Sequence, residues 1–175
     1  MTTTWISEDG EPVSKKISIF GWMRVFSRGS AIIFIILFGL ILKFVLRFFE
    51  KPVFGDRRPV TPYITVLVSK ISLWLLSIPV TRIGAPLLQP GAFVANHTSW
   101  LDIFALNSGQ SLYFVSKSEV SNWPGIGLLA KATGTLFIRR ESKEAVAQKK
   151  LFGQRIKMGH RLLLFPEGTS TDGMR

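Results

Sequence analysis

Residues 93–104 read FVANHTSWLDIF, and this stretch predicts the passage from a strand to a helix on which the fold is organised. An apolar run leads into the polar residues 96–99, and an apolar stretch with one acid, Asp102, follows. On a regular helix, residues five apart point about 140° away from each other. His97 and Asp102 can therefore meet only if His97 lies in the turn and Asp102 in the first helical turn.

The spacing of these residues supports two interpretations. In the first, Ser99 is the N-cap of the helix and Asp102 completes a capping-box-like pattern, so that both are structural. In the second, His97 and Asp102 form a catalytic dyad, in which the imidazole removes a proton from a hydroxyl and the carboxylate fixes its tautomer. The chain has no Gly-x-Ser-x-Gly elbow, so the dyad would act on a hydroxyl that the acceptor substrate supplies. The spacing alone leaves both interpretations open.

The composition restricts the classes of protein to be considered. The 175 residues are 47% hydrophobic, include 14 Phe and 5 Trp, and carry a formal net charge of +11. Apolar and basic character together indicate a membrane surface with anionic lipid, or else nucleic acid. The absence of cysteine excludes disulfides and thiol catalysis, and two histidines argue against a structural zinc site.

The first 80 residues read as a membrane-anchoring region that contains a pair of helices. Residues 31–49 (AIIFIILFGLILKFVLRFF) carry no charge before Lys43, and a run of this kind fits lipid better than a protein core. Residues 64–80 (ITVLVSKISLWLLSIPV) are apolar too, with Pro79 expected to end the helix. This second segment is predicted to lie in the membrane interface, because a weak polar stripe recurs along it at helical spacing: Thr65, Ser69 and Ser72.

Basic residues flank the first apolar segment on both sides, so the positive-inside rule does not settle its orientation. A hairpin of two spans would place the basic residues between the segments, Lys51, Arg57 and Arg58, on the outer side, against that rule. We therefore expect a partly inserted, monotopic pair of helices with the remainder of the protein in the cytoplasm.

From residue 81 to 175 short apolar runs alternate with helix-like stretches, which predicts an α/β domain with helical crossovers. The predicted strands are residues 91–95, 112–116, 135–138 and 162–165. The predicted helices are residues 99–106, 124–132 and 142–157. His160, which precedes the fourth strand, is expected to be structural or exposed.

Two later stretches give the histidine a context. GTLFIRR (134–140) ends a strand with two arginines, and FPEGTS (165–170) ends another with Pro, Glu and Gly. In this order after Asn-His-x-x-x-x-Asp, they resemble the glycerolipid acyltransferase family, the lysophospholipid acyltransferases, over residues 80–175. The resemblance implies an α/β fold with a mixed sheet and helical crossovers, and an N-terminal membrane anchor.

The resemblance also implies roles for individual residues. His97 would be the general base on the acceptor hydroxyl and Asp102 its orienting partner, with attack on an acyl thioester. The acyl donor would be acyl-acyl carrier protein or acyl-coenzyme A, and no metal or further cofactor is expected. Binding of the acceptor head group would involve Lys117, Arg139, Arg140, Glu167 and Gly168.

The third motif departs from the family at Ser170, where arginine is usual. A serine lacks the fork-shaped, charged donor suited to phosphate, and the sequence EGTSTDG resembles the bacterial branch that acylates lyso-ornithine lipids. We therefore expect lyso-ornithine lipid as acceptor, with 1-acyl-sn-glycerol-3-phosphate acylation as the alternative. The family continues beyond the third motif, so the chain is expected to be an N-terminal fragment.

Two other classes remain as alternatives, a membrane adaptor and a nucleic-acid binder. An adaptor would explain the anchor but not three ordered motifs. Nucleic acid is not expected as a partner, because the aromatic residues lie mostly in apolar runs. The expected partners are membrane lipids and acyl carrier protein, at the bacterial inner membrane with the catalytic domain on the cytoplasmic side.

Overall fold

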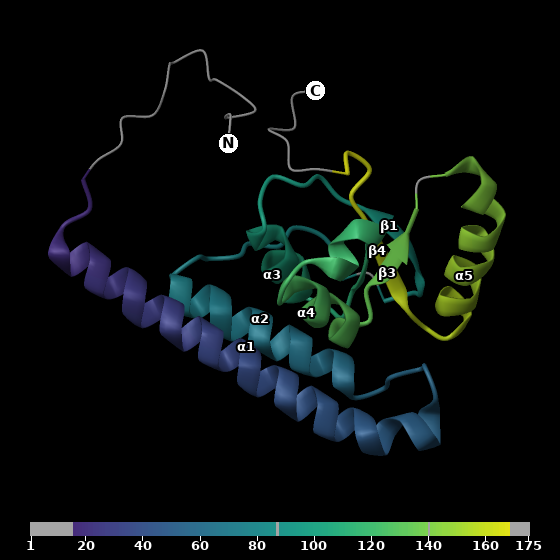
Figure 1. The fold of residues 1–175 in the computed structure, drawn as a ribbon, viewed down its shortest axis with the longest axis horizontal. Helices are drawn as coiled ribbons and strands as arrows, with labels where there is room; N and C mark the ends of the chain where they lie inside the picture. The colour runs from purple at the N-terminus through teal and green to yellow at the C-terminus, as the bar shows by residue number, and fades with distance from the viewer. Residues whose placement is uncertain (1–15, 87, 140, 169–175) are drawn as a thin grey trace, which may run out of the picture.

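The computed structural model describes residues 16–86, 88–139 and 141–168. Two helices pack side by side along one flank of an α/β domain (Figure 1). The chain passes from α1, Ile19–Phe54, to α2, Thr61–Leu76, and only then enters the sheet.

Helix α1 is longer than the apolar run of residues 31–49 from which it was predicted, and most of its large apolar side chains are exposed. Its 36 residues begin at the Ser18 N-cap, whose hydroxyl accepts a hydrogen bond from the Gly21 amide at 3.2 Å. Within the described part of the chain, α1 alone is long and apolar enough to cross a membrane. Helix α2 has 16 residues and a length of about 24 Å, against a hydrocarbon core of about 30 Å. The expected anchoring pair is thus reduced to one membrane-capable helix with a shorter helix packed beside it.

Two of the three residues of the polar stripe on α2 are buried within the protein, and the predicted position of this helix in the membrane interface stays a prediction. Ser69 and Ser72 are 2% and 0% exposed on a helix that contacts α1 and α3. On the α1 side, a Cβ added to Gly39 would lie 2.5 Å from the Val68 side chain, so glycine is required there for the two backbones to approach. Small side chains on both helices therefore permit this close packing.

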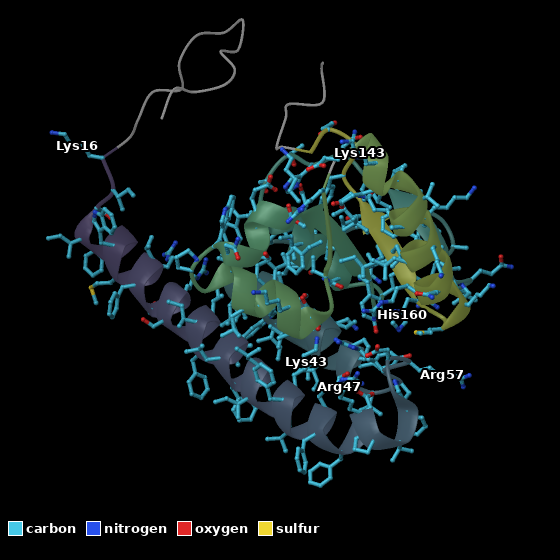
Figure 2. The ribbon with its side chains drawn as sticks, turned by 45° about the vertical axis from the view of Figure 1, so that its right-hand side comes forward. Lys16, Lys43, Arg47, Arg57, Lys143 and His160 are labelled. Atoms are coloured by element: carbon cyan, nitrogen blue, oxygen red, sulfur yellow. The ribbon has the colours of Figure 1, made fainter. Side chains whose placement is uncertain are left out.

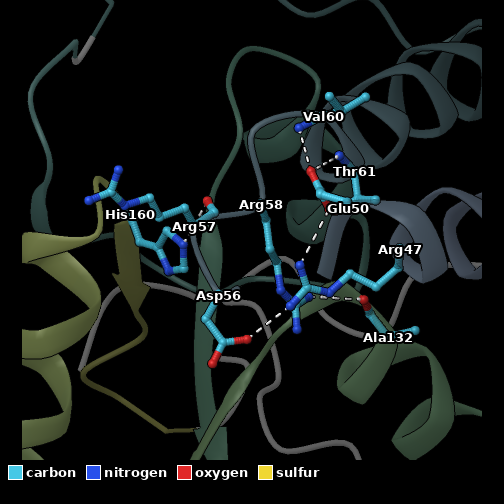
Figure 3. A network of polar contacts seen from close by, with 9 residues as sticks. All are labelled: Arg47, Glu50, Asp56, Arg57, Arg58, Val60, Thr61, Ala132 and His160. Carbon is cyan, nitrogen blue, oxygen red and sulfur yellow. Dashed lines mark hydrogen bonds and ion pairs between the residues drawn. The ribbon is translucent and has the colours of Figure 1, made fainter. Parts of the chain in front are cut away.

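A carboxylate on α1 caps the start of α2. The Glu50 side chain is buried, and its Oε1 accepts hydrogen bonds from the backbone amides of Val60 at 2.6 Å and Thr61 at 3.1 Å. Its Oε2 accepts from the Thr61 hydroxyl at 2.6 Å, and Figure 3 shows these bonds at the turn between the helices. Because the first amides of a helix lack partners within it, Glu50 satisfies donors that would otherwise be buried without acceptors. It thereby fixes the direction in which α2 leaves α1.

The sheet has four strands in the order β1-β4-β2-β3, and every described pairing is parallel. The strands are β1 Gly91–Val94, β2 Tyr113–Lys117, β3 Leu136–Ile138 and β4 Arg161–Leu164, each within two residues of its predicted bounds. The mixed sheet that we expected is therefore wrong for the described strands. Helical segments join successive strands, and a connection of that kind returns the chain in the same direction.

The connections include three α-helices and two short 3-10 helices: α3 Leu101–Asn107, η1 Ser118–Asn122, α4 Ile126–Thr133, η2 Ser142–Glu144 and α5 Ala145–Lys157. The predicted helix 142–157 thus begins with a separate 3-10 turn. The core of the domain centres on Leu162, which is fully buried. It forms a cluster with the buried side chains of Tyr113, Val115 and Leu136. Partly buried side chains of α5, including Leu151 and Phe152, pack against this cluster.

The turn between α1 and α2 lies against the amino edge of the sheet. His160, the residue before β4, donates from Nε2 to the Arg57 carbonyl at 3.2 Å and stacks on the Tyr113 ring with centroids 4.1 Å apart. Arg58 donates to the Ala132 carbonyl, at the end of α4, at 3.4 Å. His160 is only 2% exposed, and burial lowers the pKa of its imidazole, so its role is structural. These contacts attach the helical pair to the domain.

We predict that Glu50→Ala destabilises the protein by about 3 kcal/mol, because it leaves buried amides without an acceptor. Glu50→Gln should lose less, since its side-chain carbonyl can still accept from the amides of Val60 and Thr61. Thermal unfolding in detergent measures both. The exposed Glu119→Ala is the control and should leave the midpoint unchanged. An Ala variant as stable as the control would contradict the capping role.

Candidate active site

The candidate site lies at the carboxyl edge of the sheet, where the ends of β1 and β4 meet. Val94 pairs with Leu164 in the parallel register, so the residues that follow these strands start side by side. His97 lies on the loop after β1, and the Phe165–Gly168 turn follows β4. The first and third sequence motifs, about 70 residues apart, are therefore brought together by strand pairing alone.

His97 and Asp102 form the hydrogen bond that the dyad requires. The His97 Nδ1 lies 2.9 Å from Asp102 Oδ2, and the two side chains are 19% and 21% exposed. The carboxylate can only accept, so Nδ1 carries the proton and Nε2 presents its lone pair. No other described residue hydrogen-bonds to Nε2, which leaves that nitrogen available to a substrate hydroxyl.

Asp102 also organises the turn, so the contacts of the capping pattern and the His97–Asp102 hydrogen bond occur on the same side chain. Its Oδ2 accepts from the backbone amides of Thr98 at 2.7 Å and Ser99 at 2.9 Å. The Ser99 hydroxyl in turn accepts from the Leu101 amide at 3.2 Å. The side chain of Asp102 thus reaches back as a capping box requires, although the helix itself begins at Leu101 after Trp100. One carboxylate fixes both the helix start and the imidazole.

Asp102 is held in its charged form. Burial raises the pKa of this carboxyl, but hydrogen bonds from the Ser99 amide, the His97 side chain and the Thr98 amide outweigh it and hold the pKa below its usual range. The aspartate is therefore a carboxylate at neutral pH, as a group that stabilises a developing imidazolium must be.

The third motif supports His97 from two further directions. The Phe165 ring stacks on the imidazole, with centroids 4.1 Å apart and planes at 17°. Glu167 accepts a hydrogen bond from the His97 backbone amide at 3.3 Å. Gly168, at φ 70°, donates its amide to the Phe165 carbonyl at 3.1 Å and closes the turn that turns Glu167 back. Ring, backbone and Nδ1 of His97 are each held by a different group.

The remaining predicted residues lie at the same edge or outside the described residues. Lys117 ends β2, next to β4, and is exposed. Arg139 follows β3, and β3 lies three strands away from β1 in the sheet, a separation of about 14 Å. The guanidinium of Arg139 lies 3.7 Å from the Glu144 carboxylate. The structure therefore does not bring Arg139 to the dyad. Arg140 and Ser170 lie outside the described residues.

Sequence reasoning missed the role of Phe165 and the two amides that Asp102 binds. Phe165 had a signal, because it directly precedes Pro166 and Glu167 in a motif otherwise read for its polar residues. Its stacking on His97 depends on the pairing of β1 with β4, which no local pattern encodes.

The dyad adjoins the helical pair and an exposed apolar surface. Helix α3, which carries Asp102, packs against α2. Three large apolar side chains around the dyad are exposed, namely Val94 at 71%, Trp100 at 60% and Ile103 at 44%. An amphipathic or lipid-like molecule could contact these side chains while a hydroxyl reaches Nε2.

The sequence of this chain is similar to those of known proteins. The chain is 48% identical over 171 residues to a lyso-ornithine lipid O-acyltransferase of Rhodobacter capsulatus, an alignment that covers 98% of this chain and 62% of that protein. A protein of the same name from Pseudomonas aeruginosa is 47% identical over 49% of this chain and 33% of its own length. A 1-acyl-sn-glycerol-3-phosphate acyltransferase of Neisseria gonorrhoeae is 34% identical over 51% of this chain and 36% of its own length.

The chain spans about three fifths of the length of the Rhodobacter relative, and its alignments to the other two cover about a third of theirs. No solved structure matches it. The three relatives named here are bacterial enzymes of lipid acylation by name, and one described helix of this chain has the length and composition to enter a membrane, which indicates membrane association. The family model named Acyltransferase matches residues 81–175, the domain that carries His97, Asp102 and the Phe165–Gly168 turn, and the chain therefore belongs to the acyltransferase family.

Proposed function

We propose that this protein transfers a fatty acyl group from an acyl thioester to the hydroxyl of a lysolipid. The single observation that carries the proposal is the His97 imidazole, held at Nδ1 by Asp102 and with Nε2 without a described partner. This is the arrangement of a general base whose nucleophile comes with the substrate.

In the proposed reaction, Nε2 of His97 accepts the proton of the lysolipid hydroxyl as its oxygen attacks the thioester carbonyl. The resulting imidazolium is stabilised by the Asp102 carboxylate. When the tetrahedral intermediate collapses, the C–S bond breaks and the imidazolium returns the proton to the leaving thiolate. The products are an ester and a free thiol carrier, and His97 is regenerated. Phe165 and Glu167 hold the ring and backbone of His97 through this cycle.

The acceptor we propose is lyso-ornithine lipid. The relatives from Rhodobacter capsulatus and Pseudomonas aeruginosa are both named lyso-ornithine lipid O-acyltransferase. In addition, Ser170 occupies the position where a phosphate-binding arginine is usual in the family. Acylation of 1-acyl-sn-glycerol-3-phosphate, which forms phosphatidic acid, is the second candidate. The Neisseria relative named for that acylation is 34% identical over 51% of this chain. Lys117 at the open edge offers a cation to the head group in either case. The donor is acyl-acyl carrier protein or acyl-coenzyme A.

We further propose a monotopic anchor at the bacterial inner membrane, with the domain on the cytoplasmic side. The turn before α2 contacts His160 and Ala132 of the domain, and α2 itself packs on α3. A helix held in this way lies along the domain and does not cross the bilayer. The exposed apolar side chains of α1 project away from the rest of the protein in Figure 2 and supply the surface for lipid contact.

We predict that His97→Ala lowers the rate by at least about a hundredfold, the low end of general-base effects. Asp102→Asn should lower kcat comparably, because an amide cannot stabilise the imidazolium. Its side-chain oxygen can still accept from the amides of Thr98 and Ser99, so the fold should persist. Thiol release with an acyl thioester and a lysolipid measures the rate, and thermal unfolding measures the fold.

Ser99→Ala is the matched control for this pair. It removes the hydroxyl that accepts from the Leu101 amide but leaves the dyad, so it should cost about 1 kcal/mol of stability and little rate. If Asp102→Asn loses stability but keeps its rate, the aspartate is a capping residue alone.

We predict that the enzyme prefers lyso-ornithine lipid to lysophosphatidic acid in kcat/KM, and that Ser170→Arg narrows the ratio by about ten- to a hundredfold. A charge-assisted hydrogen bond to a phosphate is worth about 1.5–3 kcal/mol, and 1.4 kcal/mol is a factor of about ten. Thr171→Arg adds the same charge one residue further and should change the ratio less. A native preference for lysophosphatidic acid of about tenfold or more would instead assign the protein to the phosphatidic-acid-forming class.

We predict that residue 57 lies on the cytoplasmic side. The chain has no cysteine, so Arg57→Cys and the α5 control Lys149→Cys each create one exposed thiol. An impermeant maleimide should label neither in intact spheroplasts and both after permeabilisation. Labelling of residue 57 alone in intact spheroplasts would contradict the monotopic anchor and favour a hairpin. High salt should not release the protein, because apolar burial is not screened by ions.

A further inference from the structure

A cavity of about 240 Å³ lies where the end of α1, the turn after it and α4 meet. Five of its nine lining residues are cationic and one is acidic: Lys43, Phe44, Arg47, Lys51, Asp56, Arg58, Thr61, Lys131 and Ala132. Figure 2 shows Lys43 and Arg47 between α1 and the α/β domain. The proposed acyl transfer uses none of these residues.

The charges around this cavity are not balanced by the described part of the protein. Asp56 pairs with Arg47 at 2.9 Å, and Glu50, which also caps the start of α2, pairs with the same Arg47 at 3.5 Å, so both nearby carboxylates are used by one of the five cations. Lys43 is 6% exposed and donates to the neutral Thr65 hydroxyl, with no ion pair to a described carboxylate. Burying a cation without a counter-ion is costly, so the cavity favours an anion.

Arg58 points to the same conclusion. Its Nη1 makes a long bond to the Ala132 carbonyl, while its buried Nε has no partner among the described residues. Burial, and then the neighbouring Arg47, lower the pKa of this guanidinium. Figure 3 shows Arg47 and Arg58 close together, with Asp56 on one side and Ala132 on the other. A bound oxyanion would relieve their repulsion and could accept from both planar donors.

The cavity and the dyad lie at opposite edges of the sheet. Arg58 lies beside Gly134, which precedes β3, and near the amino ends of β2 and β4 at Tyr113 and His160. His97 follows the carboxyl end of β1. The strands are parallel and about 13 Å long, so a ligand in the cavity is separated from the acyl-transfer site by the sheet.

The surroundings of the cavity indicate the rest of the ligand. Phe44 lines it and is also 51% exposed, and the exposed rings of Phe48 and Phe49 follow on α1. A ligand with an anionic head and apolar chains would match the cations and this surface together. Basic pockets beside membrane helices bind anionic lipid head groups for the same reason.

We propose that this cavity binds the phosphate of an anionic phospholipid as a site separate from the acyl-transfer centre, with the acyl chains along α1. The protein recognises the phosphate oxygens. Arg47, Arg58 and Lys43 hold them from inside the cavity, and the exposed Lys51 and Lys131 donate to them at its opening. The bound lipid links the membrane to the turn that attaches α1 and α2 to the domain.

The test measures the thermal midpoint of the purified protein in nonionic detergent as lipid is added, because a ligand that binds the folded state raises it. Phosphatidylglycerol should raise the midpoint in a saturable manner, and phosphatidylcholine should not. The double variant Lys51→Gln/Lys131→Gln, both at exposed positions, should weaken the apparent affinity by about tenfold or more, since each lysine removed is a charged donor to the phosphate. Lys149→Gln/Lys150→Gln on α5 makes the same change in net charge elsewhere and should bind as before.

Each shift is taken relative to the midpoint of the same variant without lipid, so a change in basal stability does not enter. His97→Ala should keep the response to phosphatidylglycerol, which separates this site from the proposed dyad. Equal shifts with phosphatidylcholine, or equal losses in both double variants, would overturn the proposal. Inorganic phosphate that binds as tightly as the lipid would overturn the lipid assignment. The readout does not require acyl transfer, so its failure leaves the proposed function intact.

Discussion

The carboxylate of Asp102 is the group on which the candidate site depends. It receives the amides of Thr98 and Ser99 and the Nδ1–H of His97 on one oxygen, Oδ2. The same carboxylate oxygen therefore holds both the turn and the imidazole. A residue with two duties of this kind tolerates little change, because a side chain that satisfies the amides must also carry a negative charge to serve the imidazole.

Parallel pairing completes the site from a distant part of the chain. With β4 inserted beside β1, the third motif supplies Phe165 to the face of the imidazole and Glu167 to its backbone. Groups from two loops thus fix the side chain of His97, and its Nε2 has no hydrogen-bond partner among the described residues.

The two edges of the sheet have different partners. The carboxyl edge holds the dyad, and α3, which carries Asp102, packs against α2. The amino edge receives the turn between α1 and α2 through His160, Arg57 and Arg58. Because Glu50 on α1 accepts hydrogen bonds from the start of α2, this turn links the apolar helix α1 to the domain. The domain therefore has a defined orientation to whatever surface α1 enters.

The sequence by itself determined what depends on neighbouring residues. Apolar periodicity located all four strands within two residues, and the spacing from Ser99 to Asp102 indicated the hydrogen bond between them, although the helix begins at Leu101, after the predicted Ser99 cap. The order of the motifs indicated the family. Tertiary structure alone decided the strand order, the stacking of Phe165 on His97, and the burial of Ser69 and Ser72 against the protein. These features join residues tens of positions apart, and their free energy comes from packing and strand pairing across the whole domain, which a local pattern does not record.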